Sequence, residues 1–112
     1  MSIYEEIYPP IETILDMEPE ELAPVILKHL SVSGMQNFNM HNFTIGTDQN
    51  FVSWAGQDNL LREKILKRFI VAWRWLEREL FIAPQPGNID WTFITPRGQE
   101  ILDSQDFETY RK

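Results

Sequence analysis

The chain of 112 residues is 43% hydrophobic and 12% aromatic, which is typical of one compact globular domain and not of a disordered chain. It contains no cysteine, which excludes disulfide bonds and thiolate metal sites. Its formal net charge of −7 argues against tight nonspecific binding to nucleic acid, because phosphate contacts need a basic surface.

The sequence shows neither a signal peptide nor a membrane span. Its first residues include Glu5 and Glu6, where a signal peptide would have a basic region and an apolar core. No run approaches the roughly 20 apolar residues of a membrane-spanning helix. The lack of cysteine fits a reducing compartment. We therefore expect a cytoplasmic protein without a membrane partner.

Residues 1–17 predict an N-terminal helical extension that is interrupted in the middle. Isoleucines recur at spacings of three and four, as on an amphipathic helix: Ile3, Ile7, Ile11 and Ile14. Pro9 and Pro10 cannot continue a helix. We expect a short turn or helix first, and then a second helix that starts near Pro10 and ends by Met17. The pattern leaves open whether this extension packs on the domain.

The next helix is predicted to begin at Pro19. Proline suits the first helical position, and Glu20 and Glu21 lie favourably at the positive end of the helix dipole. The helix is expected to end near Ser33, and Pro24 should kink its first part. The buried stripe is predicted to consist of Leu22, Val25, Ile26 and Leu30.

Residues 35–59 predict an irregular connection with one short strand at residues 42–45. Asn and Gln are frequent in it and two glycines interrupt it, which is typical of loops. Its aromatic residues imply packing on the core: Phe38, Phe43, Phe51 and Trp54. Asp58 or Asn59 is expected to cap the helix that follows.

The longest predicted helix covers residues 62–81 and has two different sides. Its apolar side consists of Leu61, Ile65, Phe69, Ala72, Trp73, Leu76 and Leu80. Its opposite side collects Lys64, Lys67, Arg68, Arg74 and Arg78. Val71 and Trp75 lie between these cations.

A β-hairpin is predicted directly after this helix, with strands at residues 81–83 and 89–95. The turn is assigned to Pro84, Pro86, Gly87 and Asn88. Thr95 then caps a helix whose first residue is Pro96. Residues 103–112 continue that helix or form the root of a linker. The whole chain, 1–112, is thus predicted to be one mainly α domain with a small antiparallel hairpin, in the order of a winged helix-turn-helix.

No motif for catalysis, cofactor binding or metal binding occurs. His29 and His41 are the two histidines, and neither is joined to carboxylates at the spacing of metal ligands. There is no Gly-x-Ser-x-Gly nucleophile motif, and the five scattered glycines do not form a phosphate loop. We expect a chain that is not an enzyme and has no catalytic residue, no cofactor, no metal and no small-molecule substrate.

The basic side of the long helix carries a hypothesis of nucleic-acid binding. Its lysines and arginines can contact phosphates, and an arginine can read guanine in a major groove. The predicted contact residues are Lys64, Lys67, Arg68, Arg74, Arg78 and Arg97, the last supporting a wing near Asn88. The ordinary alternative is a solvated helix face whose charge is offset by Glu63, Glu77 and Glu79.

A protein partner or a homodimer is the competing expectation for this helix. Trp73 and Trp75 are two residues apart, so a straight helix cannot bury both on one narrow stripe. Val71 and Trp75 would be the contact residues if they are exposed. Packing of residues 35–59 over Trp75 is the favoured alternative.

Residues 72–102, AWRWLERELFIAPQPGNIDWTFITPRGQEIL, resemble the N-terminal winged-helix region of prokaryotic proteins that carry a C-terminal HEPN-type domain, the Ymh-like group. Residues 18–23 and 106–111 are similar to the start and end of that region. The resemblance implies a winged-helix fold and a role in phage defence or mobile-element conflict. We therefore expect a nucleic-acid-binding or sensing module of a prokaryotic phage-defence or regulatory system. A looser similarity to MarR-type transcription regulators points the same way.

Two features of the chain depart from that family. Leu80 and Phe81 stand where the family has a glycine between the helix and the first strand. No arginine precedes a histidine at the spacing of the HEPN ribonuclease motif, so the resemblance implies no nuclease activity.

Overall fold

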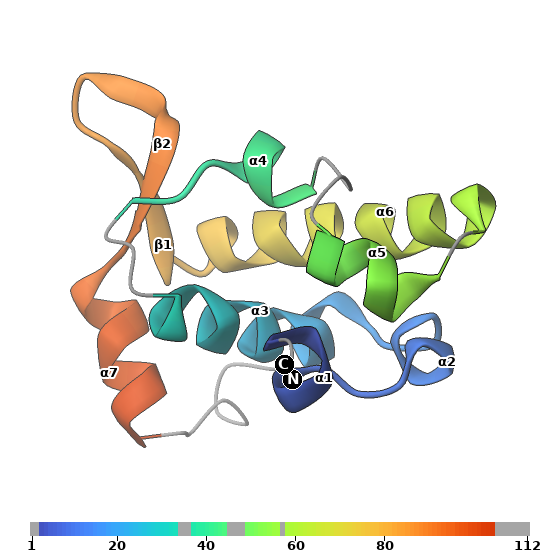
Figure 1. Cartoon of the computed structure of the whole chain (residues 1–112). Coiled ribbons are helices and arrows are strands. Elements are labelled where there is room, and N and C mark those ends of the chain that lie inside the picture. Colours follow the sequence, from blue (N-terminus) through green and yellow to red (C-terminus); the bar gives the residue numbers. More distant parts are fainter. Residues whose placement is uncertain (1–2, 34–36, 45–48, 57, 105–112) are drawn as a thin grey trace.

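The computed structural model describes residues 3–33, 37–44, 49–56 and 58–104. Helices α3 and α6 lie side by side at its centre, α4 lies above α6, and the hairpin and α7 lie at one end (Figure 1). Helix α5 contacts α1 and α6. The described part is mainly helical with one antiparallel hairpin, which confirms that much of the predicted fold. In chain order the elements are α1 (Ile3–Ile7), α2 (Ile11–Ile14), α3 (Pro19–Val32), α4 (Met40–Thr44), α5 (Gln49–Ala55), α6 (Asn59–Arg78), β1 (Ile82–Gln85), β2 (Asn88–Ile94) and α7 (Pro96–Ser104).

The N-terminal extension is broken at Pro9 and Pro10 as predicted, and it packs on the domain. Tyr4 and Tyr8 are buried, and the Tyr4 ring stacks on Tyr8 and on Trp54 of α5 with centroid distances of 5.4 and 5.3 Å. The Tyr8 hydroxyl and His29 Nδ1 lie 2.8 Å apart. Burial, and to a lesser extent the neighbouring Tyr4, raises the pKa of the Tyr8 phenol well above its usual range. This polar pair therefore belongs to the core.

Helix α3 begins at Pro19 as predicted, because the turn before it is fixed by its own side chains. The backbone N–H of Glu18 donates to Glu21 Oε1 at 2.9 Å, which is half of a capping box. The helix continues through Pro24. Its buried residues are Leu22, Ala23, Ile26, Leu27 and Leu30. The prediction missed Ala23 and Leu27, and it wrongly included Val25, which is only half-buried.

The strand predicted at residues 42–45 is wrong. Met40–Thr44 form helix α4, because the Asn39 carboxamide accepts the backbone N–H of Asn42 at 3.0 Å and starts a helix there. The extended residue is Phe38 instead, whose N–H and carbonyl exchange two hydrogen bonds of 2.7 Å with Thr92 of β2. Residues 45–48 lie outside the described part of the chain. Helix α5, with Phe51 buried, was also not predicted.

Helix α6 starts at Asn59, three residues earlier than predicted, and Asp58 caps it. Its carboxylate accepts the backbone N–H groups of Leu60 and Leu61 at 2.9 and 3.2 Å. A cap of this kind stabilises a helix by about 1 kcal/mol.

Helix α6 ends at Arg78, and Leu80, two residues later, has a left-handed backbone with φ of 65°. The N–H of Leu80 donates to Glu77 O at 3.1 Å, and the N–H of Phe81 donates to Leu76 O at 3.0 Å. This is the Schellman pattern, in which glycine usually holds the left-handed position. Leu80 is 63% exposed, so its assignment to the apolar side of the helix is wrong: the helix has already ended.

We expect Leu80→Gly to raise the free energy of unfolding by about 1 kcal/mol, because it removes the cost of a left-handed backbone at a side chain with little buried surface. The same substitution at the exposed Leu60 inside α6 should lower it by about 0.5–1 kcal/mol. Urea unfolding followed by circular dichroism measures both. A loss of stability in Leu80→Gly would mean that the leucine side chain contributes more than the strain costs.

The hairpin pairs Ile82 with Ile94 and Ala83 with Phe93, and a register shift follows Pro84. Two residues predicted in the turn belong to strands instead, since Pro84 lies in β1 and Asn88 begins β2. The turn is formed at residues 86–87, with Gly87 at φ of 77°. Thr95 caps α7 as predicted, since its hydroxyl accepts the N–H of Gly98 at 3.0 Å. Helix α7 reaches Ser104, and the predicted continuation over residues 105–112 lies outside the described residues.

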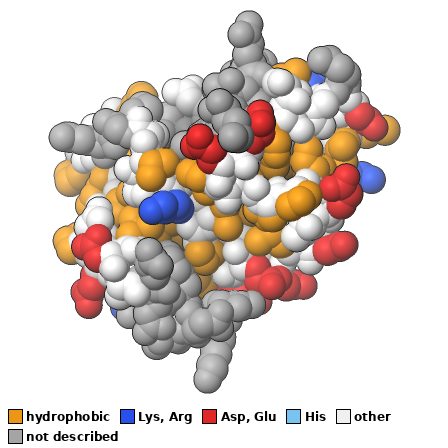
Figure 2. All heavy atoms as spheres, turned by 60° about the horizontal axis from the view of Figure 1, so that its bottom comes forward, with side chains coloured by type: hydrophobic (Ala, Val, Ile, Leu, Met, Phe, Trp, Pro, Cys, Tyr) orange, Lys and Arg blue, Asp and Glu red, His pale blue; other side chains and the backbone are white. Residues whose placement is uncertain are grey.

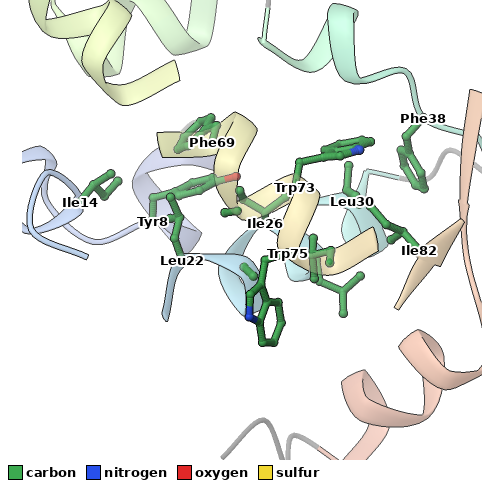
Figure 3. Packing of buried hydrophobic residues seen from close by; sticks show 14 of the residues in the cluster. Tyr8, Ile14, Leu22, Ile26, Leu30, Phe38, Phe69, Trp73, Trp75 and Ile82 are labelled. Carbon is green, nitrogen blue, oxygen red and sulfur yellow. The ribbon is translucent and has the colours of Figure 1, made fainter. Parts of the chain in front are cut away.

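The core is built mainly from the facing sides of α3 and α6. The two neighbouring tryptophans of α6 leave the helix in different directions (Figure 3). Trp73 points toward Phe38 and lies 5.4 Å from the ring of Phe43. Trp75 points away from that side, and its ring lies 5.9 Å from that of Phe81. Both are buried, so the core encloses more of α6 than one narrow stripe.

Candidate nucleic-acid interface

The outward side of α6 is the most basic surface in the described part of the chain. Helical periodicity places the buried residues of α6 on one side, and the remaining positions face outward. Lys64, Lys67, Arg68, Arg74 and Arg78 are all exposed there. The helix holds six lysines and arginines and two glutamates, so it has a local positive charge on an acidic chain.

Three of these cations have carboxylate partners. Lys67 lies 3.2 Å from Glu63, Arg74 lies 2.8 Å from Glu77, and Arg78 lies 3.4 Å from Glu79. Exposed pairs of this kind contribute only about 0.2–1 kcal/mol, so a phosphate can replace the carboxylate at little cost. Lys64 has no polar partner among the described residues.

Arg68 and Arg97 differ from the other predicted contact residues because each also holds parts of the fold together. Arg68 Nη1 donates to the carbonyl of Met17 at 3.1 Å and ties the α2–α3 connection to α6. Arg97 Nε donates to Glu79 O at 2.9 Å, and its guanidinium lies 5.3 Å from the centroid of the Phe81 ring. Arg97 therefore lies at the base of the hairpin.

The hairpin itself brings no positive charge to the interface, because residues 82–94 contain no lysine or arginine. Asn88 is exposed at the tip as predicted, and Ile89 beside it is 81% exposed. Asp90 adds a negative charge. Positively charged contacts with phosphate in this region would therefore come from α6 and not from the hairpin.

A polar cleft of ≈ 490 Å³ lies between α4, α6 and β2. The side chain of Asn39 closes one edge, since its Nδ2 donates to the carbonyl of Asp90 at 3.0 Å. Sequence reasoning missed this cleft, because it depends on α4 standing where a strand was expected. Its lining residues are Asn39, Met40, His41 and Asn42 before and in α4, Trp73, Arg74 and Glu77 in α6, and Ile89, Asp90, Trp91 and Thr92 in β2.

A second hollow, which we call the basic-rimmed groove, has a volume of ≈ 570 Å³. It lies between α6 and the residues from the end of α2 to the start of α3. Different cations of α6 line the two hollows. Arg74 lines the polar cleft, whereas Lys64, Lys67 and Arg68 line the groove. The residues of the basic-rimmed groove are Leu15, Met17, Pro19, Leu22, Lys64, Lys67, Arg68 and Val71.

The two predicted protein-contact residues are placed differently. Trp75 is only 8% exposed and lies against Phe81, which follows the helix. The Trp75 ring is therefore too buried to be a contact surface for a partner protein. Val71 is 52% exposed and lines the basic-rimmed groove.

The surface in Figure 2, which brings the bottom of Figure 1 forward, has a different character. Hydrophobic side chains gather across its middle, carboxylates surround them, and few lysines or arginines are visible. A polyanion would be repelled by such a border, which leaves the outward side of α6 as the candidate interface.

The two histidines take part in different environments. His29 packs among Tyr4, Tyr8 and Phe43, whereas His41 is exposed at the polar cleft. Within the described residues, no three His, Asp or Glu side chains form a group that could hold a metal ion. None of the described helices is long and apolar enough to cross a membrane.

Comparison with known proteins gives no relative for this chain. No family model matches it, and no curated protein or solved structure is significantly similar to it. The resemblance to the HEPN-associated winged-helix region stays a prediction, and function has to be argued from the geometry.

Proposed function

We propose that this chain is a winged-helix module that binds duplex nucleic acid, with α6 as its recognition helix. The observation that carries the proposal is that α6 buries one side, exposes its lysines and arginines on the other, and ends directly in the hairpin. This is the arrangement in which a helix can enter a major groove while the hairpin lies beside it.

The pairing of Phe38 with Thr92 supports the winged-helix assignment. It places an extended residue between α3 and α4 next to β2, so the order across the sheet is Phe38, β2, β1. Winged-helix domains place a strand after their first helix at this same position beside the hairpin. The helices α4, α5 and α6 then follow before the wing.

In this arrangement the charge on α6 provides affinity and the polar cleft provides selectivity. Lys64, Lys67, Arg74 and Arg78 contact phosphates, and the polar side chains of the cleft beside Arg74 offer hydrogen bonds to base edges. The acidic remainder of the chain opposes loose association, so binding depends on docking of this one face. Residues 86–88 at the tip of the wing carry no charge, so the contacts that they add depend little on the salt concentration.

A titration of labelled duplex DNA, read by fluorescence anisotropy, tests this function. If about four phosphates are contacted, the affinity should fall about 100-fold between 50 and 200 mM salt. Methyl NMR of the methionines gives the position: the Met40 signal in the polar cleft should move on addition of duplex. No binding to any duplex or single strand at about 50 mM salt would contradict the proposal, since phosphate affinity is strongest there.

The biological setting rests on the resemblance alone. A prokaryotic phage-defence or regulatory system, with the chain in the cytoplasm, is the setting that we propose. A protein-interaction module is the second candidate function, and the exposed Val71 beside the basic-rimmed groove favours it.

A further inference from the structure

The basic-rimmed groove has an apolar floor that the described residues leave uncovered. Leu22 closes the floor at 1% exposure, while Val71 on the opposite wall is 52% exposed. Leu15 and Met17 lie in the link between α2 and α3 and are half-buried. The hydrogen bond from Arg68 Nη1 to the Met17 carbonyl, 3.1 Å long, holds that link against α6. This contact fixes the position of the α2–α3 link that forms one side of the groove.

The charges on this groove have one sign. Lys64, Lys67 and Arg68 line it, and none of the described residues that line it carries a carboxylate. Lys67 is paired with Glu63, but Lys64 has no polar partner among the described residues. On a chain with a net charge of −7, three cations around an apolar floor favour a negatively charged occupant with an apolar side.

The dimensions fit a helix. From Lys64 to Val71, α6 rises about 10 Å, which is two helical turns. A partner helix presents apolar anchors at i, i+3, i+4 and i+7 over the same length. Nucleic acid fits this surface less well, because an apolar floor has nothing to offer to a phosphate backbone.

We propose that the basic-rimmed groove binds an acidic amphipathic helix of a partner protein. Leucine-like side chains of that helix pack on Leu15, Met17 and Val71. Its flanking carboxylates pair with Lys64 and Lys67. This inference goes beyond the nucleic-acid function and does not depend on it. The two functions share Lys64 and Lys67, so a duplex and the peptide would compete for these lysines, whereas Arg74 and Arg78 do not line the groove.

The test uses a fluorescein-labelled helical peptide of about 16 residues, with leucines at i, i+3, i+4 and i+7 and glutamates beside them. One control peptide carries lysine in place of each glutamate, and another carries serine in place of each leucine. The acidic leucine peptide should bind at least about 10-fold more tightly than either control, because only it satisfies both floor and rim. Equal binding of the lysine peptide would overturn the proposal.

Two substitutions of valine by glutamate locate the binding site. Val71→Glu places a carboxylate on the apolar wall of the groove and should weaken peptide binding at least about 10-fold. Val32→Glu makes the same change on α3, at a residue that is 49% exposed and does not line the groove, and it should change affinity less than about twofold. Equal effects of the two substitutions would place the peptide elsewhere.

Methionine methyl NMR separates the two hollows in the folded full chain. The peptide should move the signal of Met17, which lines the groove, and leave that of Met40, which lines the polar cleft. The reverse pattern would overturn the proposal. So would a duplex that displaces the peptide and is itself weakened by Val71→Glu to the same degree, because the groove would then be part of a nucleic-acid surface.

Discussion

Replacing Arg74 and Arg78 together with glutamate should weaken duplex binding at 50 mM salt by about 100-fold and lower the salt dependence by about two phosphate contacts. Both arginines are exposed on the outward side of α6, and their present partners Glu77 and Glu79 are only weakly held. The substitution converts two attractive contacts with phosphate into repulsive ones. The loss should be similar for all duplex sequences if the arginines contact phosphates.

The single variant Arg78→Glu should weaken duplex binding in the same direction as the double variant, and Lys28→Glu is its matched control. Both reverse one exposed charge, and Lys28 belongs to α3 and not to the proposed face of α6. It should change duplex affinity by less than about threefold at 200 mM salt, where charges beyond about 10 Å are screened. Anisotropy titrations at both salt concentrations measure these effects, and circular dichroism verifies that each variant is folded. If both charge reversals had the same effect, binding would depend on net charge and the proposed face of α6 would be wrong.

Replacing Gly98 with alanine should lower the free energy of unfolding by about 3 kcal/mol. A Cβ atom at this position would lie 2.1 Å from the backbone carbonyl oxygen of Phe81 and 3.0 Å from Ile94 Cγ2. The Phe81 carbonyl cannot simply move away, because it accepts the N–H of Thr95 at 3.0 Å. The whole of α7 would have to shift relative to the end of α6 and the hairpin.

Glu100→Ala is the matched control, since Glu100 is an exposed residue of the same helix. It should change stability by less than about 0.5 kcal/mol, as surface substitutions usually do. Urea unfolding followed by tryptophan fluorescence measures both variants. A Gly98→Ala protein as stable as the original would mean that α7 does not pack closely on the Phe81 backbone.

The elements that could be predicted from the sequence are those with strong local signals. Asp58, Pro19 and Thr95 each mark a helix start that the structure confirms, because capping depends on residues only two or three positions away. The long buried stripe of α6 is equally local, since it follows from helical periodicity alone.

The structure at Phe38 and the start of α4 could not be predicted, because it depends on distant residues. Phe38 is extended only by its pairing with Thr92 of β2, and Asn39 is held by the carbonyl of Asp90. Short polar stretches have weak intrinsic preferences, so such tertiary contacts decide between helix and strand. The polar cleft depends on the same contacts and was missed for the same reason.

The candidate site was predicted only in part. The outward position of Lys64, Lys67, Arg74 and Arg78 follows from periodicity, but the division of the α6 cations between two hollows does not. It depends on how the α2–α3 link and α4 pack on either side of α6. The packing of Phe81 against Trp75 also depends on tertiary structure, since Phe81 lies beyond the end of α6, where helical periodicity no longer predicts positions.

The pairing of Phe38 with Thr92 has a consequence for the order of folding. Closing a loop between residues so far apart in the chain costs more entropy than forming a hairpin or a helix turn. The hairpin and α6 can form from neighbouring residues first, and Phe38 can join only when β2 is already in place. The polar cleft therefore completes late, and the amide protons of Phe38 and Thr92 should exchange with solvent before those of the α6 core.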